Sequence, residues 1–220
     1  METAEQVEAY ANADFAVPHS RVIELFREVF PGAEIAGAVL DAGCGTGDIS
    51  VRFARAFPHC RVTGVDGSTA MLKKGAEILS REPAELRTQV ALIQGLLPDA
   101  PVTPQAFATI LSNSLLHHLH DPQVMWKTVR NFACPGARVF IVDLMRPDNE
   151  ETARHLTALY CAGEPAVLRR DFFNSLLAAF TPEEIREQLL HAGFGHFNVR
   201  AVSDRHVMVW GEIPDGRTIE

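Results

Sequence analysis

Short apolar runs alternate with amphipathic stretches over the first two-thirds of the chain, and this alternation restricts the fold more than any other feature. Five runs predict buried strands, at residues 38–43, 61–66, 90–94, 107–113 and 138–144. The stretches between the first three runs, residues 48–57 and 69–82, carry apolar residues at helical spacing, and Ser68 can cap the second. Strands separated by helices predict a mostly parallel sheet that is covered on both faces.

A helix between the fourth and fifth runs has its own start and stop signals. Asp121 is a good N-cap, Pro122 suits the first helical position, and Pro135-Gly136 would end the helix.

The last third of the chain departs from the alternation. Thr181 and Glu184 predict a capping box at the start of a helix. Residues 196–202 and 205–211 then read as two strands of a closing hairpin. Residues 147–180 fit neither pattern and predict a helical insertion packed over one edge of the sheet.

Bulk composition excludes several classes of protein. A net charge of -8, without a run of Lys or Arg, argues against an rRNA or DNA substrate. The four cysteines are widely spaced, so they predict neither a zinc framework nor a disulfide scaffold. The start "METAEQVEAY" lacks the features of a signal peptide, and no apolar run approaches the roughly 20 residues that span a bilayer. We expect a cytoplasmic protein with no nucleic-acid or membrane partner.

The stretch "LDAGCGTGD" is the most specific signal in the chain. Glycines at 43, 45 and 47 follow a predicted strand and precede a predicted helix, where a ligand can approach the backbone closely. A dinucleotide fingerprint would need a third glycine where Asp48 stands, and a P-loop would need a Lys. Asp66 ends the next strand, where a carboxylate can hold ribose hydroxyls. The pattern favours a ligand with a ribose and no phosphate over a glycine turn without a ligand.

Two quoted segments carry a resemblance to a known family. "VLDAGCGTGDISVRFA" resembles the first motif of class I S-adenosylmethionine-dependent methyltransferases, and "VTGVDGSTAML" resembles their second motif. The resemblance is to the small-molecule branch typified by ubiquinone/menaquinone-biosynthesis methyltransferases, and it extends from about Val39 to Leu144. It implies an α/β, doubly wound, Rossmann-like fold with a seven-stranded sheet that ends in an antiparallel hairpin. We expect one domain, residues 1–220, with an N-terminal helical cap (1–36), a cofactor-binding core (37–146), a helical insertion or substrate cap (147–180) and a closing helix and hairpin (181–211).

The resemblance also implies how S-adenosylmethionine would bind. The backbone of Gly43, Cys44 and Gly45 would pass under its methionine part, and Asp41 would anchor the amino group or only order the loop. Asp66, followed by Gly67 and Ser68, would hold the ribose. Met71 would pack on the adenine, or be ordinary core. Where the family commonly has an acid facing the adenine, this chain has Leu96, so either the backbone of Gly95 and Leu96 or the side chain of Asp99 would take that contact. Tyr10 would close over the cofactor.

The stretch "SNSLLHHLHDP" resembles the family's wall of the methyl-transfer site, which would place Asn113 and Ser114 near the cofactor. His117 and His118 are candidates for a general base, or they are structural. A metal site is disfavoured because the two imidazoles point about 100° apart on a helical turn, and His120 is expected to face solvent.

The expected activity is in-line transfer of a methyl group from S-adenosylmethionine to a small-molecule O, N, S or C acceptor. Two alternatives stay open: non-methylating chemistry with the same cofactor, and a non-catalytic cofactor-binding protein. The acceptor would be enclosed by the segments around Tyr10, Phe15 and His19 and around Arg169 and Arg170. An inward-facing arginine would suit a carboxylate or phosphate on the acceptor, whereas the other reading is a solvated pair.

Overall fold

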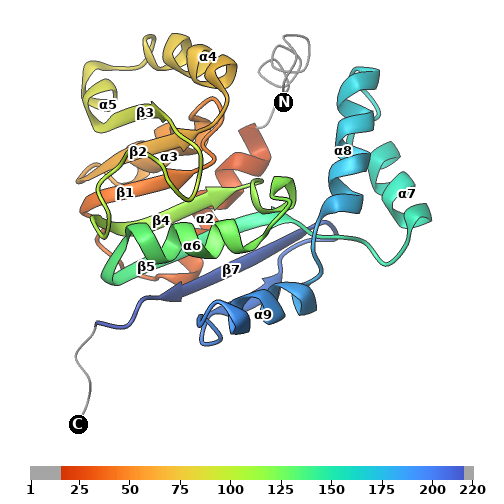
Figure 1. The fold of residues 1–220 in the computed structure, drawn as a ribbon. Coiled ribbons are helices and arrows are strands. Elements are labelled where there is room, and N and C mark those ends of the chain that lie inside the picture. Colours follow the sequence, from red (N-terminus) through yellow and green to blue (C-terminus); the bar gives the residue numbers. More distant parts are fainter. Residues whose placement is uncertain (1–15, 216–220) are drawn as a thin grey trace.

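The structure is a computed structural model that describes residues 16–215. A seven-stranded sheet forms the centre of the molecule (Figure 1). The strands are β1 (Gly37–Ala42), β2 (Cys60–Asp66), β3 (Val90–Gln94), β4 (Phe107–Asn113), β5 (Ala133–Leu144), β6 (Asn198–Ala201) and β7 (His206–Glu212). Their order is β3-β2-β1-β4-β5-β7-β6, with β1 to β5 parallel and β7 antiparallel to both of its neighbours. The predicted fold class, including the closing hairpin, is confirmed.

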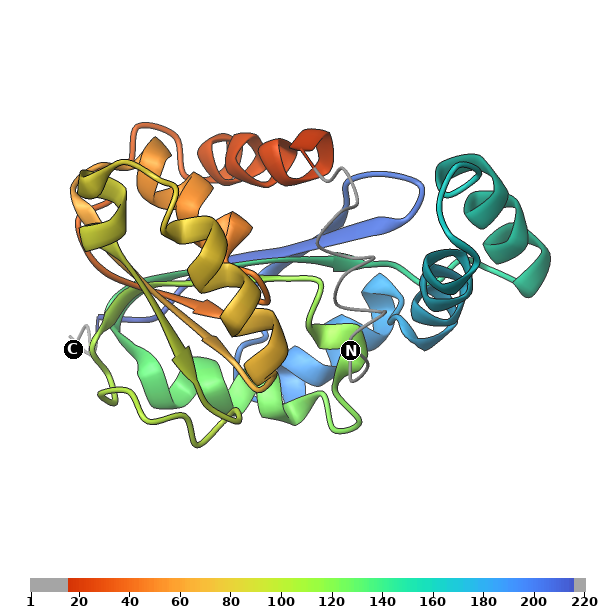
Figure 2. The ribbon, with the colours of Figure 1, turned by 90° about the horizontal axis from the view of Figure 1, so that it is seen from above.

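Helices cover both faces of the sheet. They are α2 (Ala16–Val29), α3 (Asp48–Ala56), α4 (Thr69–Leu79), α5 (Ala84–Gln89), the short 3-10 turn η1 (Leu116–His118), α6 (Gln123–Phe132), α7 (Glu150–Tyr160), α8 (Ala166–Ala178) and α9 (Pro182–His191). Figure 2 shows α2 and α3 on one side of the sheet and α6 and α9 on the other.

Alternate residues of the central strands feed two separate apolar cores. In β5, Val139 and Ile141 join the core under α6 and α9, whereas Phe140 and Val142 join the core under α2 and α3. Successive side chains of a strand point to opposite faces, so a strand covered on both sides is apolar at most of its positions. This is why the central strands read as continuous apolar runs in the sequence.

The predicted helix signals are confirmed at two caps. Ser68 accepts a hydrogen bond from the N–H of Met71 at the start of α4. Thr181 and Glu184 form the capping box of α9.

Three local expectations are wrong. The helix α6 begins at Gln123 and ends at Phe132, so Pro135 and Gly136 do not end it. Both residues lie inside β5, which starts five residues before the predicted strand 138–144. Gly136 has a φ of 75°, and the pairing of β4 with β5 shifts register there, so the pair marks an irregularity in a strand. The helix predicted over 69–82 ends at Leu79, and the short α5, which no sequence signal predicted, follows it.

The insertion does not pack over an edge strand. Helices α7 and α8 lie beyond the carboxyl end of β5 (Figures 1 and 2), and α8 contacts η1. Met145 and Phe180, at the two ends of the insertion, form a β-bridge where the chain leaves the sheet and returns to it. Leu156 of α7 and Leu176 of α8 share a small apolar core with Leu144 at the end of β5. Its position therefore places α8 beside the histidine segment.

No helix within residues 16–215 has the length and apolar character needed to cross a membrane.

Candidate functional site

The predicted site residues gather at the carboxyl ends of β1, β2 and β4. The chain turns back at this point of the sheet, because β1 lies between β2 on one side and β4 on the other. Ligands of open parallel sheets bind at such a switch point, where the loops that follow neighbouring strands diverge.

The glycine loop after β1 depends on backbone conformations that favour glycine. Gly43, Gly45 and Gly47 have φ values of 74°, 56° and 77°. A Cβ on Gly43 would also lie 2.7 Å from the Leu115 side chain. The N–H groups of Gly43 and Cys44 donate to the Val65 carbonyl at 2.8 and 3.1 Å, so the loop is held against β2.

Asp66 connects the loop to the start of α4. One carboxylate oxygen accepts the N–H of Gly45 at 2.9 Å, and the other accepts the N–H of Ser68 at 2.7 Å. Met71 is buried on the first turn of α4, and its terminal methyl lies 3.2 Å from where a Cβ on Gly45 would be. The structure thus brings the two predicted motifs into direct contact through Asp66.

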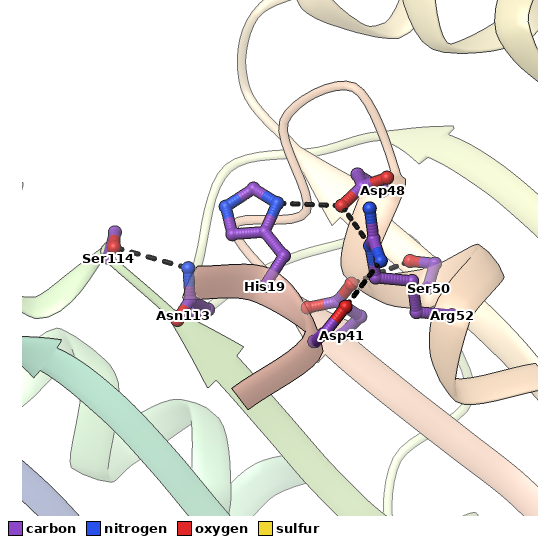
Figure 3. Close-up of polar contacts among 8 residues, drawn as sticks. His19, Asp41, Asp48, Ser50, Arg52, Asn113 and Ser114 are labelled. Atoms are coloured by element: carbon purple, nitrogen blue, oxygen red, sulfur yellow. Dashed lines mark hydrogen bonds and ion pairs between the residues drawn. The ribbon is translucent and has the colours of Figure 1, made fainter. Parts of the chain in front are cut away.

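Asp41 is buried beneath the loop, on β1. It accepts a 2.6 Å hydrogen bond from the Ser50 hydroxyl of α3, as Figure 3 shows. Burial raises the pKa of Asp41 to about 6, although the Ser50 hydrogen bond opposes the shift and the charge of Asp66 adds to it. Burial also raises the pKa of the Cys44 thiol, which excludes a thiolate in the loop at neutral pH.

A cluster that the sequence did not predict joins α2 to α3. Nδ1 of His19 lies 2.6 Å from a carboxylate oxygen of Asp48, and Nε of Arg52 donates to the same oxygen at 2.6 Å (Figure 3). Burial raises the pKa of Asp48, but the hydrogen bonds and charges of His19 and Arg52 outweigh it and hold that pKa below its usual value. In the sequence, the signal for this cluster is the i,i+4 spacing of Asp48 and Arg52 on one helix.

The histidine segment is shaped by the end of β4. Asn113 ends the strand, and its side-chain amide donates to the Ser114 hydroxyl at 3.2 Å. Ser114 has a φ of 55°, and its N–H donates to the Val142 carbonyl at 2.9 Å. The chain therefore turns sharply before η1, which places His117 next to the end of β5.

Asp143, which sequence reasoning missed, is the partner of His117. Its carboxylate lies 2.5 Å from Nδ1 of His117, and the two side chains are 2% and 3% exposed. Asp143 also accepts the N–H groups of Leu116 at 2.7 Å and Leu144 at 2.8 Å. An acid at the end of the buried run 138–144 was the signal, because a carboxylate that ends an apolar strand needs partners.

The arrangement sets which nitrogen of His117 faces the site. With Nδ1 held by a carboxylate, the proton of a neutral imidazole resides on Nδ1 and Nε2 is an acceptor. Within residues 16–215, Nε2 makes no hydrogen bond, and the only buried unpaired side-chain N or O atom is Oγ1 of Thr109. Nε2 is therefore not fully buried, although the His117 side chain as a whole is only 3% exposed.

His118 packs on His117 with ring centroids 4.0 Å apart, but it remains exposed. Neighbouring protein removes part of the water around the His118 imidazole, and His117 repels its charge; together they lower the pKa of His118 to about 4. His118 is thus neutral at pH 7, and His120 is exposed as expected. No group of three or more His, Cys, Asp or Glu side chains among the described residues is arranged to hold a metal ion.

The remaining predicted residues lie at the margin. The N–H of Gly95 donates to the Asp66 carbonyl at 3.0 Å, which places the β3 loop beside the β2 loop. Leu96 is 76% exposed, and its side chain would contact a Cβ on Gly67. Asp99 is exposed, and Tyr10 lies outside the described residues.

The structure describes the candidate acceptor segments in part. His19 lies near the glycine loop through Asp48, whereas Phe15 lies outside the described residues. Arg169 and Arg170 are exposed and line a hollow shared with α7, which agrees with the reading of a solvated pair and not with an inward-facing arginine.

Comparison with known proteins identifies the same core. Residues 40–139 match the family model described as a methyltransferase domain. An uncharacterised methyltransferase of Mycobacterium tuberculosis is 28% identical over 125 residues, which cover 57% of this chain and 59% of that protein. A demethylmenaquinone methyltransferase of Thermotoga maritima is 28% identical over 185 residues, covering 79% of this chain and 75% of that protein.

A solved structure shares the fold. A SAM-dependent methyltransferase from Aquifex aeolicus superposes with a TM-score of 0.68 at 16% identity, over 97% of this chain and 100% of that one. This chain therefore matches less than two-thirds of the length of the mycobacterial relative, whereas its fold covers the full length of the Aquifex structure.

Proposed function

We propose that this chain is a class I S-adenosylmethionine-dependent methyltransferase, as its match to a methyltransferase domain supports. It would transfer the methyl group of S-adenosylmethionine to a small-molecule acceptor at the carboxyl ends of β1, β2, β4 and β5. The observation that carries the proposal is the meeting of the glycine loop, Asp66 and the His117–Asp143 pair at one end of the sheet. When bound, the cofactor supplies a methyl group on a positively charged sulfur. The protein has to bind it, orient the acceptor and accept a proton.

The residues around the glycine loop suit a ribose and an amino acid moiety. Asp66 is held at the end of β2 by two backbone N–H groups, and its remaining lone pairs can accept ribose hydroxyls. Asp41 supplies a buried carboxyl group under the loop, where a cationic amino group would favour its charged form. Met71 supports the loop from below, which agrees with a packing role as much as with adenine contact.

His117 is the group that we assign as the base. An O–H or protonated amine acceptor must lose a proton as its new bond to carbon forms. Nε2 of His117 accepts that proton, while Asp143 keeps Nδ1–H in place and stabilises the imidazolium that results. His118, with its lowered pKa, is a weak base and instead forms the wall against which His117 packs.

Calorimetry with S-adenosylhomocysteine tests the cofactor site. Replacement of Asp66 by Ala removes a charged acceptor from two backbone N–H groups and any contact to the ribose, so we expect at least about a tenfold loss of affinity. Glu187→Ala, which removes an exposed carboxylate from α9, should bind as the wild type does. Lack of binding by the wild-type protein would remove the basis of the proposal.

The chemistry is tested with cofactor that carries a labelled methyl group. A screen of hydroxyl, amine, thiol and activated-carbon acceptors should yield a labelled product. Tight binding without label transfer to any acceptor class would favour non-methylating chemistry or a binding protein.

The base is tested with Asp143→Asn and His117→Ala. Asp143→Asn leaves Nδ1 without its anion, so kcat should fall by orders of magnitude while the affinity for S-adenosylhomocysteine stays unchanged. His120→Ala, at an exposed position of the same segment, is the matched control. Unchanged turnover in His117→Ala would show that the enzyme works by positioning alone.

A further inference from the structure

The helical insertion contains a hollow that the proposed methyl-transfer site does not use. It is an open hollow of about 490 Å³ between α7 and α8, lined by Arg154, Arg169, Arg170 and Phe173 together with three small side chains. Three guanidinium groups line it and no acidic side chain does, in a chain whose net charge is -8. A local positive charge against that background attracts anions.

The guanidinium groups are available to a ligand. Arg169 has no acidic partner among the described residues. Arg170 lies 3.7 Å from Asp171, and Arg154 pairs with Glu150 on the same helix. All three arginines are exposed, and exposed ion pairs of this kind contribute at most about 1 kcal/mol, so an anion can displace the carboxylates.

Phe173 orders the hollow and gives it an apolar floor. It lies four residues after Arg169 and three after Arg170, so all three share one face of α8. From α7, the Arg154 guanidinium lies 5.0 Å from the centroid of the Phe173 ring. Leu177, one turn further along the same face, is 38% exposed and extends the apolar surface.

The hollow and the acceptor wall lie on different sides of α8. Asp171 is turned about 100° from Arg170 around the helix, and its charge acts on His118 of η1. Helix α8 also contacts η1 directly. The hollow is therefore separate from the site where the methyl group would be transferred.

We propose that the hollow between α7 and α8 binds a phosphate group carried by a molecule with an apolar part. Guanidinium groups match phosphate oxygens in pairs of hydrogen bonds, and three positive charges suit a dianion better than a single carboxylate. Phe173 and Leu177 would contact the apolar part. Such a phosphate can come from a free phosphorylated metabolite or from the headgroup of a phospholipid, and the experiment separates the two.

Calorimetric titration of the full chain with butyl phosphate at low ionic strength tests the proposal. We expect saturable binding that the double variant Arg169→Ala/Arg170→Ala weakens by at least about tenfold. The control double variant Arg21→Ala/Arg186→Ala removes the same charge from two exposed arginines elsewhere, each paired with a glutamate three residues away. It should bind as the wild type does, and thermal unfolding should show that both variants are folded.

Vesicles identify the source of the phosphate. Sedimentation with phosphatidylcholine vesicles, with and without phosphatidic acid, should show binding only with phosphatidic acid if the site takes a headgroup, and no binding if it takes a free metabolite. The Arg169→Ala/Arg170→Ala variant must lose butyl phosphate binding in both cases, and it must also lose vesicle binding if the wild type binds vesicles. Absence of butyl phosphate binding, or equal losses in the test and control variants, overturns the proposal.

Discussion

Replacing Asp41 by Asn should make the protein more stable at neutral pH. Asp41 is 1% exposed, and burial raises its pKa from the usual 3.8 to about 6. The ionised form is therefore disfavoured in the folded protein, and ionising it at pH 7 costs stability. The shift of about 2 pKa units corresponds to about 3 kcal/mol at 1.36 kcal/mol per unit.

The direction of the pH dependence follows from proton binding. Between pH 3.8 and about 6 the folded protein holds a proton on Asp41 that the unfolded chain has released, so stability falls as pH rises through this window. In the Asp41→Asn variant the amide oxygen would still accept the Ser50 hydroxyl, but the side chain would carry no charge. The variant should be more stable by up to about 3 kcal/mol at neutral pH, and the gain should vanish below the lower limit of the window.

Urea unfolding of the ligand-free protein at several pH values measures this difference. Asp99→Asn, at an exposed position, is the matched control and should show no such pH-dependent gain. If the Asp41→Asn variant is no more stable than wild type at neutral pH, or if its gain does not shrink in acid, the argument from burial is wrong.

The same variant separates the two roles considered for Asp41. A cationic amino group bound beside it would require the ionised carboxylate, so the affinity of the wild type for S-adenosylhomocysteine should fall as pH drops below about 6. In Asp41→Asn that dependence should disappear and the affinity should be low throughout. Unchanged affinity would mean that Asp41 only orders the loop.

Three further predictions concern the support of the site. Gly75→Ala should lower both the melting temperature and the affinity for S-adenosylhomocysteine measured by calorimetry, because the new Cβ would lie 2.7 Å from the Thr46 carbonyl oxygen of the glycine loop. Gly163→Ala is the control and should change neither quantity, since there is open space around Gly163. Phe26→Ala should cost about 3–5 kcal/mol in urea unfolding, since Phe26 is 1% exposed in the core under α2 and α3. Asp48→Asn should remove stability that is present at neutral pH and absent once pH falls well below 3.8, because the pKa of Asp48 is lowered in the folded state; thermal unfolding across that range would show a flatter acid limb.

Sequence alone determined the features that depend on neighbouring residues. The strands β3 and β4 begin and end at the predicted residues, because a short, mostly apolar run bounded by turn residues is a local signal for a strand. The caps at Ser68 and Thr181 followed from residues three positions apart. The glycine loop was predicted because the left-handed backbone of Gly43 is a local requirement of the turn.

Only the tertiary structure decided which distant residues meet. His117 and Asp143 are 26 residues apart, and His19 and Asp48 are 29 apart, so no spacing rule relates either pair. The sheet order places the end of β5 beside the end of β4, and that order brings the acid to the imidazole. The sequence therefore contained the chemical groups. Their pairing, and with it the orientation of each side chain, arose from strand order and burial, which act between segments that local patterns do not connect.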